Sequence, residues 1–208
     1  MRAMPLVSAV VSLLVAVVAP AAAAPRPHAL ADGVQNIRAR DTVAILFLRF
    51  GKEKSARFRE IVRTLEASNV IVYIEVRQDA EHPVGGGLTF IGEAHGTRWV
   101  RATVDSGTGS YIRTCQDIVR LTSILGHELQ HALEASQAAS LHDVGEFERY
   151  FRSIGVDEGA RVLDTLAARQ AGSLVADELR GMVRRSRSDV VASVGDAAPA
   201  AATARAVT

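Results

Sequence analysis

The chain has 208 residues, of which 24 are basic and 23 acidic, so its formal net charge is +1. That balance gives no electrostatic reason to expect a nucleic-acid partner or another strongly charged partner. A hydrophobic fraction of 48% is enough for a globular core, and a single cysteine excludes an internal disulfide.

The N-terminus has the features of an export signal. Arg2 supplies a positive charge, Leu6 to Ala19 form an apolar stretch of 14 residues, and small residues follow Pro20. These features predict a signal peptide over residues 1–23 and a periplasmic or secreted protein. The apolar stretch is shorter than the roughly 20 residues of a membrane span, so an uncleaved anchor is the weaker alternative and no stable span is expected after cleavage.

Composition divides the rest of the chain into three parts. Residues 24–38 are expected to be a loose leader, and residues 39–183 have the size of one folded domain. Residues 184–208 are rich in Ala and Arg and poor in large apolar groups, so they predict a disordered tail.

The domain is expected to begin with alternating strands and helices. Residues 42–50 (TVAILFLRF) are rich in large apolar side chains and predict a buried strand. Residues 52–68 have helical periodicity, and residues 69–77 (NVIVYIEVR) form a β-branched run that predicts a second strand. The glycines at 85–87 predict a flexible turn. Two further strands are expected after it and are most simply joined as a hairpin, at residues 88–93 and 98–104.

Helical patterns dominate the second half. Residues 111–136 carry an apolar stripe, residues 144–153 predict a short helix, and residues 158–183 predict a longer one. The order predicts an α+β fold, in which a small mixed or antiparallel sheet of about four strands packs on the first and last of these helices. The core positions expected on the last helix are Val162, Leu163, Leu166, Gln170 and Leu174.

The 111–136 helix contains the pentapeptide His127-Glu128-Leu129-Gln130-His131. Two His four residues apart project from one helical face, so both imidazoles can bind one Zn²⁺, while Glu128 can act as general base on a metal-bound water. In a chain with 6 His, the expected number of accidental matches is about 0.01. Both His lie opposite the leucine stripe, so we expect this helix to lie between the sheet and a cleft or another helix.

A catalytic zinc site needs a third protein ligand. The longer pattern HExxHxxGxxH is absent, because residues 132–135 (ALEA) contain neither its Gly nor its third His. Glu134 lies one helical turn after His131, but a straight helix rarely wraps three ligands around one ion, so a position beside the metal ligands is more plausible for it.

Asp164 is the favoured third ligand, since a carboxylate among alanines is costly to bury unless it is paired or bound to metal. Its alternative is an ion pair with an arginine such as Arg161 or Arg120. The other acids that remain open are Glu146, Glu148, Asp157 and Glu158.

On the pentapeptide, a preceding α/β segment and a following carboxylate-bearing helix, the chain resembles the zincin superfamily, and in particular small gluzincin-like zinc peptidases. The resemblance implies that an edge strand, here within 88–91, pairs with an extended peptide substrate. It also implies zinc held by His127, His131 and a carboxylate. Asp at position 164 departs from the family, which has Glu there.

The implied function is an exported zinc-dependent peptidase in which metal-activated water attacks the peptide bond and Glu128 transfers the proton. Its partner would be a peptide or protein substrate. The alternatives are an inactive exported binding domain on a zincin scaffold and a zinc amidase acting on cell-wall fragments. Candidates to bind substrate or stabilise the oxyanion are His95 and Tyr150, with Tyr111 and His142 also open.

Overall fold

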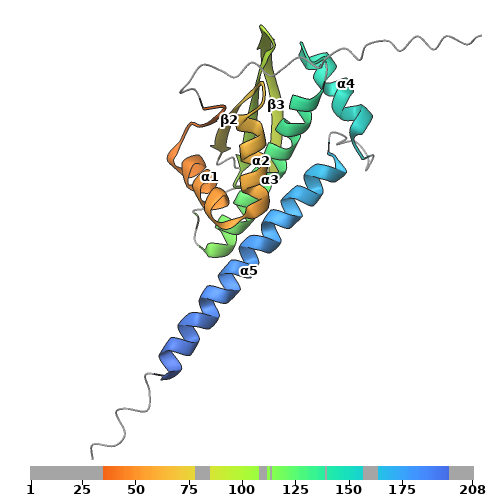
Figure 1. Cartoon of the computed structure of the whole chain (residues 1–208). Coiled ribbons are helices and arrows are strands. Elements are labelled where there is room, and N and C mark those ends of the chain that lie inside the picture. The colour runs from red at the N-terminus through yellow and green to blue at the C-terminus, as the bar shows by residue number, and fades with distance from the viewer. Residues whose placement is uncertain are drawn as a thin grey trace, which may run out of the picture.

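The computed structural model describes residues 35–77, 85–107, 112, 114–138, 140–156 and 164–196, with side chains up to residue 186. This part of the chain has five helices and a mixed four-stranded sheet, so the predicted α+β class is confirmed (Figure 1). The predicted signal peptide and the last residues of the predicted tail lie outside the described residues.

The sheet has the strand order β1-β2-β4-β3. Strand β1 (Ile37–Ala39) pairs parallel with β2 (Val70–Arg77), and β2 pairs parallel with β4 (Thr97–Asp105). Strand β3 (Gly85–Ala94) pairs with β4 alone and antiparallel, so it is an edge strand. The predicted hairpin is therefore correct, but Gly85 to Gly87 begin a strand where the sequence predicted a turn.

Strand β1 begins within residues 24–38, which the sequence predicted to be a loose leader. Ile37 is buried in the core. The buried side chain of Asn36 donates hydrogen bonds to the carbonyl oxygens of Leu65 and Ser68, at 3.1 and 2.9 Å. The ordered part of the chain therefore starts before residue 39, because a parallel partner strand supplies backbone hydrogen bonds that local composition does not indicate.

The predicted strand at 42–50 is instead helix α1 (Thr42–Lys54). Asp41 caps it by accepting a hydrogen bond from the Ala44 backbone at 2.7 Å. Ala44, Phe47 and Gly51 are buried at helical spacing, whereas Ile45 is 53% exposed. Because residues 42–50 have apolar side chains on both faces of the helix, the helical periodicity could not be recognised in the sequence. The Asp41 cap and tertiary packing outweigh the weak strand propensity of this segment.

Helix α2 (Ala56–Glu66) begins separately, so the predicted helix 52–68 combined the end of α1 with α2. Ser55 accounts for the break. Its hydroxyl accepts a hydrogen bond from the Phe58 backbone at 3.0 Å and caps α2, and it also donates to Glu178.

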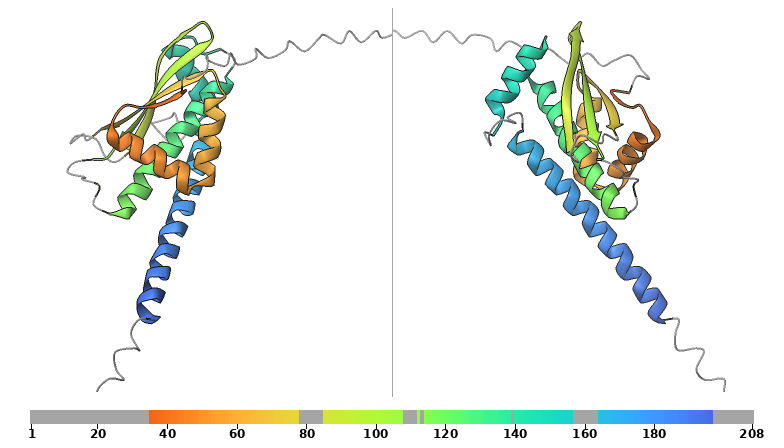
Figure 2. Two further views of the ribbon diagram at one scale, coloured as in Figure 1. Left: turned by 60° about the vertical axis from the view of Figure 1, so that its left-hand side comes forward. Right: turned by 180° about the vertical axis from the view of Figure 1, so that it is seen from behind.

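Helix α3 (Cys115–Gln137) lies between the sheet and helix α5 (Leu166–Asp196), as the sequence predicted (Figures 1 and 2). Thr114 and Asp117 form a capping box at its start. One face, which includes Leu121, Leu125 and Leu129, is buried in the core. The short helix α4 (Val144–Ile154) follows and places Phe147 and Phe151 at the other end of the same core.

Helix α5 differs from the prediction at both ends. It begins at Leu166 where the sequence predicted residue 158, and it continues to Asp196, through part of the segment 184–208 that was predicted to be a disordered tail. Leu166 and Leu174 were expected in the core but are 60% and 51% exposed. The predicted core positions 162 and 163 lie outside the described residues. The buried face is the small-residue one, with Ala168, Ala171, Val175, Ala176 and Leu179.

The small residues allow α5 to approach α3 closely. A Cβ on Gly172 would lie 3.2 Å from Cβ of His127, and a Cβ on Gly126 would lie 3.1 Å from Val175. This close approach places the start of α5 beside the histidines of α3. None of the helices in the described ranges is both long and apolar enough to span a membrane.

Candidate metal centre

The structure brings His127, His131 and Asp164 together. Nε2 of His127 lies 3.1 Å from Nε2 of His131 and 3.2 Å from Oδ1 of Asp164, and the distance from His131 Nε2 to the same oxygen is 3.7 Å. Each residue thus offers one ligand atom, and all three lie within 4.8 Å of one another. Asp164 stands two residues before α5, so it reaches the histidines from the end of the preceding connection.

These separations fit a divalent cation. With metal–ligand bonds of about 2.0–2.1 Å, two ligand atoms of a tetrahedral zinc site lie about 3.3 Å apart. Asp164 Oδ1 is buried and has no hydrogen-bond partner among the described residues, although two imidazole nitrogens lie beside it. An unsatisfied buried carboxylate oxygen is costly, and a bound cation would satisfy it.

Glu134 is placed to orient His131. Its Oε2 lies 2.9 Å from Nδ1 of His131, and its Oε1 accepts a hydrogen bond from the Thr165 hydroxyl at 2.7 Å. The carboxylate therefore favours the tautomer of His131 that carries the proton on Nδ1 and leaves the Nε2 lone pair for a metal. Both oxygens of Glu134 are occupied in this way, which favours a role beside the ligands over one as a ligand.

We expect Glu134→Gln to weaken zinc binding by about 10–100-fold, the usual cost of losing such a supporting partner. The amide can present its NH2 group to His131 or to Thr165, but it cannot accept from both. Competition with a chromophoric chelator measures the affinity. Glu60→Gln, at an exposed site on α2, is the matched control. Equal affinities for the two variants would contradict the orienting role.

Asp164 is also held by a partner. Its Oδ2 accepts a hydrogen bond from Nε of Arg169 at 2.7 Å, while Oδ1 faces the two histidines. The sequence left open a metal ligand or an ion pair with Arg161 or Arg120. Among the described residues the ion pair is made by Arg169, in the first turn of α5. Because the pair uses only one oxygen, it leaves the other for a metal.

His127 has the protonation state that a ligand requires. Burial lowers the pKa of its imidazole, and the neighbouring His131 lowers it further, against the opposing effect of Asp164. The neutral imidazole that binds metals is therefore favoured at neutral pH.

Glu128 lies between the metal centre and strand β3. It is only 4% exposed. Burial raises the pKa of its carboxyl to about 8, with a smaller contribution from the negative charges of Asp164 and Asp105. A divalent cation nearby would favour its ionised form.

Gly86 gives Glu128 its space. A Cβ at this position would lie 2.6 Å from Oε1 of Glu128 and 2.7 Å from Cγ2 of Ile124. The triple glycine at the start of β3 therefore has a steric function at position 86, and no Cβ contact within 4 Å exists at Gly87.

For the peptidase activity that the sequence predicts, we expect Gly86→Ala to lower kcat/KM by at least about 10-fold, because the methyl group would displace the Glu128 carboxylate from its position. Gly87→Ala is the matched control, one residue away on the same strand, and should retain nearly full activity. Peptide hydrolysis at saturating zinc measures both. Equal rates for the two variants would show that strand β3 can shift to accommodate the methyl group without displacing Glu128.

The raised pKa of Glu128 has a consequence for stability. In the zinc-free folded protein this carboxyl keeps its proton up to about pH 8, whereas in the unfolded chain it loses it near pH 4.3. The folded state thus binds more protons between these values, so its stability falls as the pH rises through this window. Glu128→Gln removes this loss.

We therefore expect the free energy of unfolding of Glu128→Gln to rise relative to that of the wild type as the pH increases. Between pH 4.5 and pH 8.5 this difference should grow by about 2–4 kcal/mol, as measured by urea unfolding in the presence of a chelator. A constant difference across this range would show that Glu128 ionises normally in the folded protein.

The other predicted site residues lie elsewhere. His95 occupies the β3–β4 turn with a φ of 53°, at the opposite end of β3 from Gly86, so the structure does not bring it to the metal centre. The Tyr150 hydroxyl donates to the Glu134 carbonyl oxygen at 3.1 Å, and this residue supports α3 rather than lining the cleft. His142 pairs with Glu93 at 3.1 Å.

Glu146 and Glu148, two of the alternative third ligands, lie away from the centre. Glu146 binds the backbone of His142 near the start of α4, and Glu148 is exposed on the same helix. Asp157, Glu158 and Tyr111 lie outside the described residues. Conversely, sequence reasoning missed Gly86, Thr165 and Arg169. The glycine run and the position of an Arg five residues after Asp164 were the available signals, but neither is specific.

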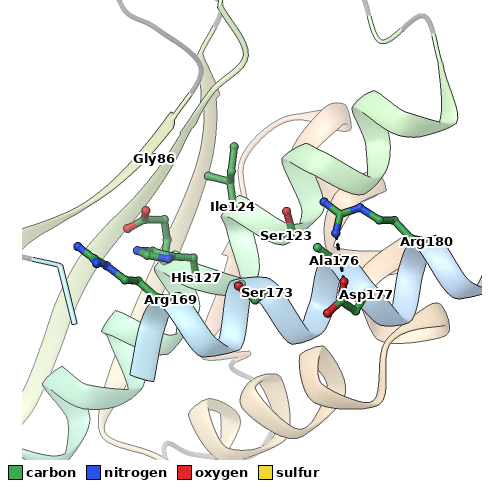
Figure 3. A pocket seen from close by; sticks show the side chains of 11 residues that line it. Gly86, Ser123, Ile124, His127, Arg169, Ser173, Ala176, Asp177 and Arg180 are labelled. Atoms are coloured by element: carbon green, nitrogen blue, oxygen red, sulfur yellow. Dashed lines mark hydrogen bonds and ion pairs between the residues drawn. The ribbon is translucent and has the colours of Figure 1, made fainter. Parts of the chain in front are cut away.

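The centre opens into a cleft. Its wall on one side is the start of β3 at Gly86, its floor is α3 and its other wall is α5 (Figure 3). One part has a volume of about 720 Å³ and a second part about 230 Å³, and Gly86, His127 and Glu128 border both. A ligand in the cleft would therefore contact both Glu128 and a metal-ligating residue.

Comparison of the chain with family models, with curated proteins and with solved structures gives no match. The geometry of this centre is therefore what indicates a function for the chain.

Proposed function

We propose that this chain is a zinc-dependent peptidase that resembles the zincins. The observation that carries the proposal is the convergence of His127 Nε2, His131 Nε2 and Asp164 Oδ1, with Glu128 beside them. A purely structural zinc site usually has four protein ligands and no use for a base. Here three ligand atoms, a buried carboxyl group and an open cleft occur together, which supports catalysis.

A zinc ion in such a site lowers the pKa of water and polarises a carbonyl group as a Lewis acid. His127 and His131 would hold it through their Nε2 atoms and Asp164 through Oδ1. Glu128 would accept the proton of the attacking water and deliver it to the leaving amine. Burial shields this carboxylate from bulk water, so the proton stays within the site between the two steps.

Edge strand β3 is the element that we propose to align the substrate. The resemblance implied that residues 88–91 pair with an extended peptide, and these residues do lie in an edge strand, which begins next to Glu128. Export is a separate part of the proposal and depends on residues 1–23, outside the described residues.

The test is zinc analysis of the purified protein together with hydrolysis of a broad peptide library. We expect about one zinc per chain and hydrolysis that a chelator abolishes and added zinc restores. Zinc without hydrolysis of any peptide would favour the binding-domain alternative. Hydrolysis of cell-wall peptides but not of casein would favour the amidase alternative. Absence of zinc at micromolar supply would refute the proposal.

A further inference from the structure

The two parts of the cleft extend in different directions from the same centre. Both are bordered by Gly86, His127 and Glu128, but otherwise they share no lining residue among those described. The smaller part, which we call the apolar arm, continues between β3 and α4. The larger part, the polar arm, continues along α3 and α5, away from β3 (Figure 3).

The apolar arm is lined by Leu88, Phe147 and Phe151, beyond the metal ligands. Strand alternation explains the position of Leu88, because it lies on the same face of β3 as Gly86. The two phenylalanines are buried and pack against each other, with ring centroids 4.7 Å apart, so this wall is rigid. The volume of about 230 Å³ includes the space beside the metal ligands. Since about 150 Å³ holds a benzene molecule in a closed apolar cavity, the arm has room for one large apolar side chain and not for a longer segment.

The polar arm has a different chemistry. Its lining includes Ser123 and Ser173, and also two arginines that already face carboxylates, Arg169 with Asp164 and Arg180 with Asp177. At about 720 Å³ it has room for several residues of a hydrated peptide. Because its arginines are paired, the arm presents no strong net charge to a substrate terminus.

From this geometry we infer that the cleft binds internal segments of peptides, with a large apolar side chain in the apolar arm next to the scissile bond. An exopeptidase needs a site that ends one residue or a few residues from the metal, with a charged group to recognise the free terminus. Here space continues on both sides of Glu128. The inference rests on the proposed peptidase function and adds its substrate class.

The test uses fluorogenic peptides that are acetylated at the N-terminus and amidated at the C-terminus, with each position varied in turn. We expect the zinc-loaded wild type to cleave them and to prefer Leu or Phe over Gly or Asp by about 10–200-fold at one fixed position next to the bond. Mass spectrometry of the products identifies that position.

Leu88→Trp fills the apolar arm and should reduce cleavage at Leu or Phe by at least about 10-fold, with less than about 3-fold change at Gly or Ala. Ile45→Trp, at an exposed position of α1 that lines neither arm, is the matched control and should change neither. Zinc content and circular dichroism should match the wild type in both, which separates loss of the pocket from misfolding.

The results separate this inference from the proposed function. Cleavage only of peptides with a free terminus would overturn the internal-segment inference and leave a zinc peptidase. Equal effects of Leu88→Trp and Ile45→Trp on all substrates would overturn the apolar arm as a specificity site. Absence of zinc, or of hydrolysis of any peptide, would overturn the proposed function and this inference with it.

Discussion

Glu128→Gln is expected to reduce kcat/KM for peptide hydrolysis by at least about 1,000-fold while the protein still binds one zinc. The amide has nearly the same shape as the carboxylate, but it cannot accept the proton of the attacking water. General acid–base catalysis contributes about 100–10,000-fold, and here one group is proposed to serve both proton transfers. Glu128 is not one of the three residues that offer a ligand atom, so the zinc affinity should change little.

Two measurements are needed for this prediction. Hydrolysis is measured at saturating zinc, and metal content is measured on the same sample. Glu60→Gln controls for the loss of one negative charge, because Glu60 is exposed on α2 and does not line the cleft. If Glu128→Gln reduced kcat/KM by less than about 10-fold, Glu128 would be excluded as the general base. A loss of zinc together with activity would instead make Glu128 part of the metal site.

Asp164→Ala is expected to weaken zinc binding by more than about 100-fold. Loss of a hydrogen-bonded partner of a ligand usually costs 10–100-fold, so loss of a ligand itself should exceed this range. The variant leaves two imidazoles, and it also removes the acceptor for Arg169. Asp164→Asn keeps an oxygen but loses the charge, and it should lie between the wild type and Asp164→Ala.

Asp177→Ala is the matched control for Asp164→Ala, since Asp177 is an exposed aspartate of α5 that also pairs with an arginine. Competition with a chromophoric chelator gives the affinities, and circular dichroism verifies the fold. If Asp164→Ala bound zinc as tightly as Asp177→Ala, the buried oxygen beside the histidines would have another role, and a different third ligand would be required.

Elements with one clear apolar face were predictable from sequence. Strand β2 was predicted from its β-branched run, and α3 from leucines at spacings of three and four residues. Helix α1 was not, because its apolar residues surround the helix, and the cap from Asp41 and the contacts of Phe47 decide its conformation. Local periodicity predicts an element only when one face is polar.

Within the site, the same distinction applies. The spacing of His127 and His131 determines by itself that both rings share one face of α3, since the helical repeat sets this relation. The third ligand was only the favoured one of several acids, because residues more than 30 positions apart meet only through tertiary packing.

Only the tertiary structure decided which groups are neighbours in the site. The small-residue face of α5 packs on α3 and carries Asp164 to the histidines and Thr165 to Glu134. The edge position of β3 brings Gly86 against Glu128. The sequence determined which chemistry the chain possesses, in its imidazoles and carboxylates. Distances between those groups depend on how whole elements pack, and packing energy is shared among many residues that no short pattern contains.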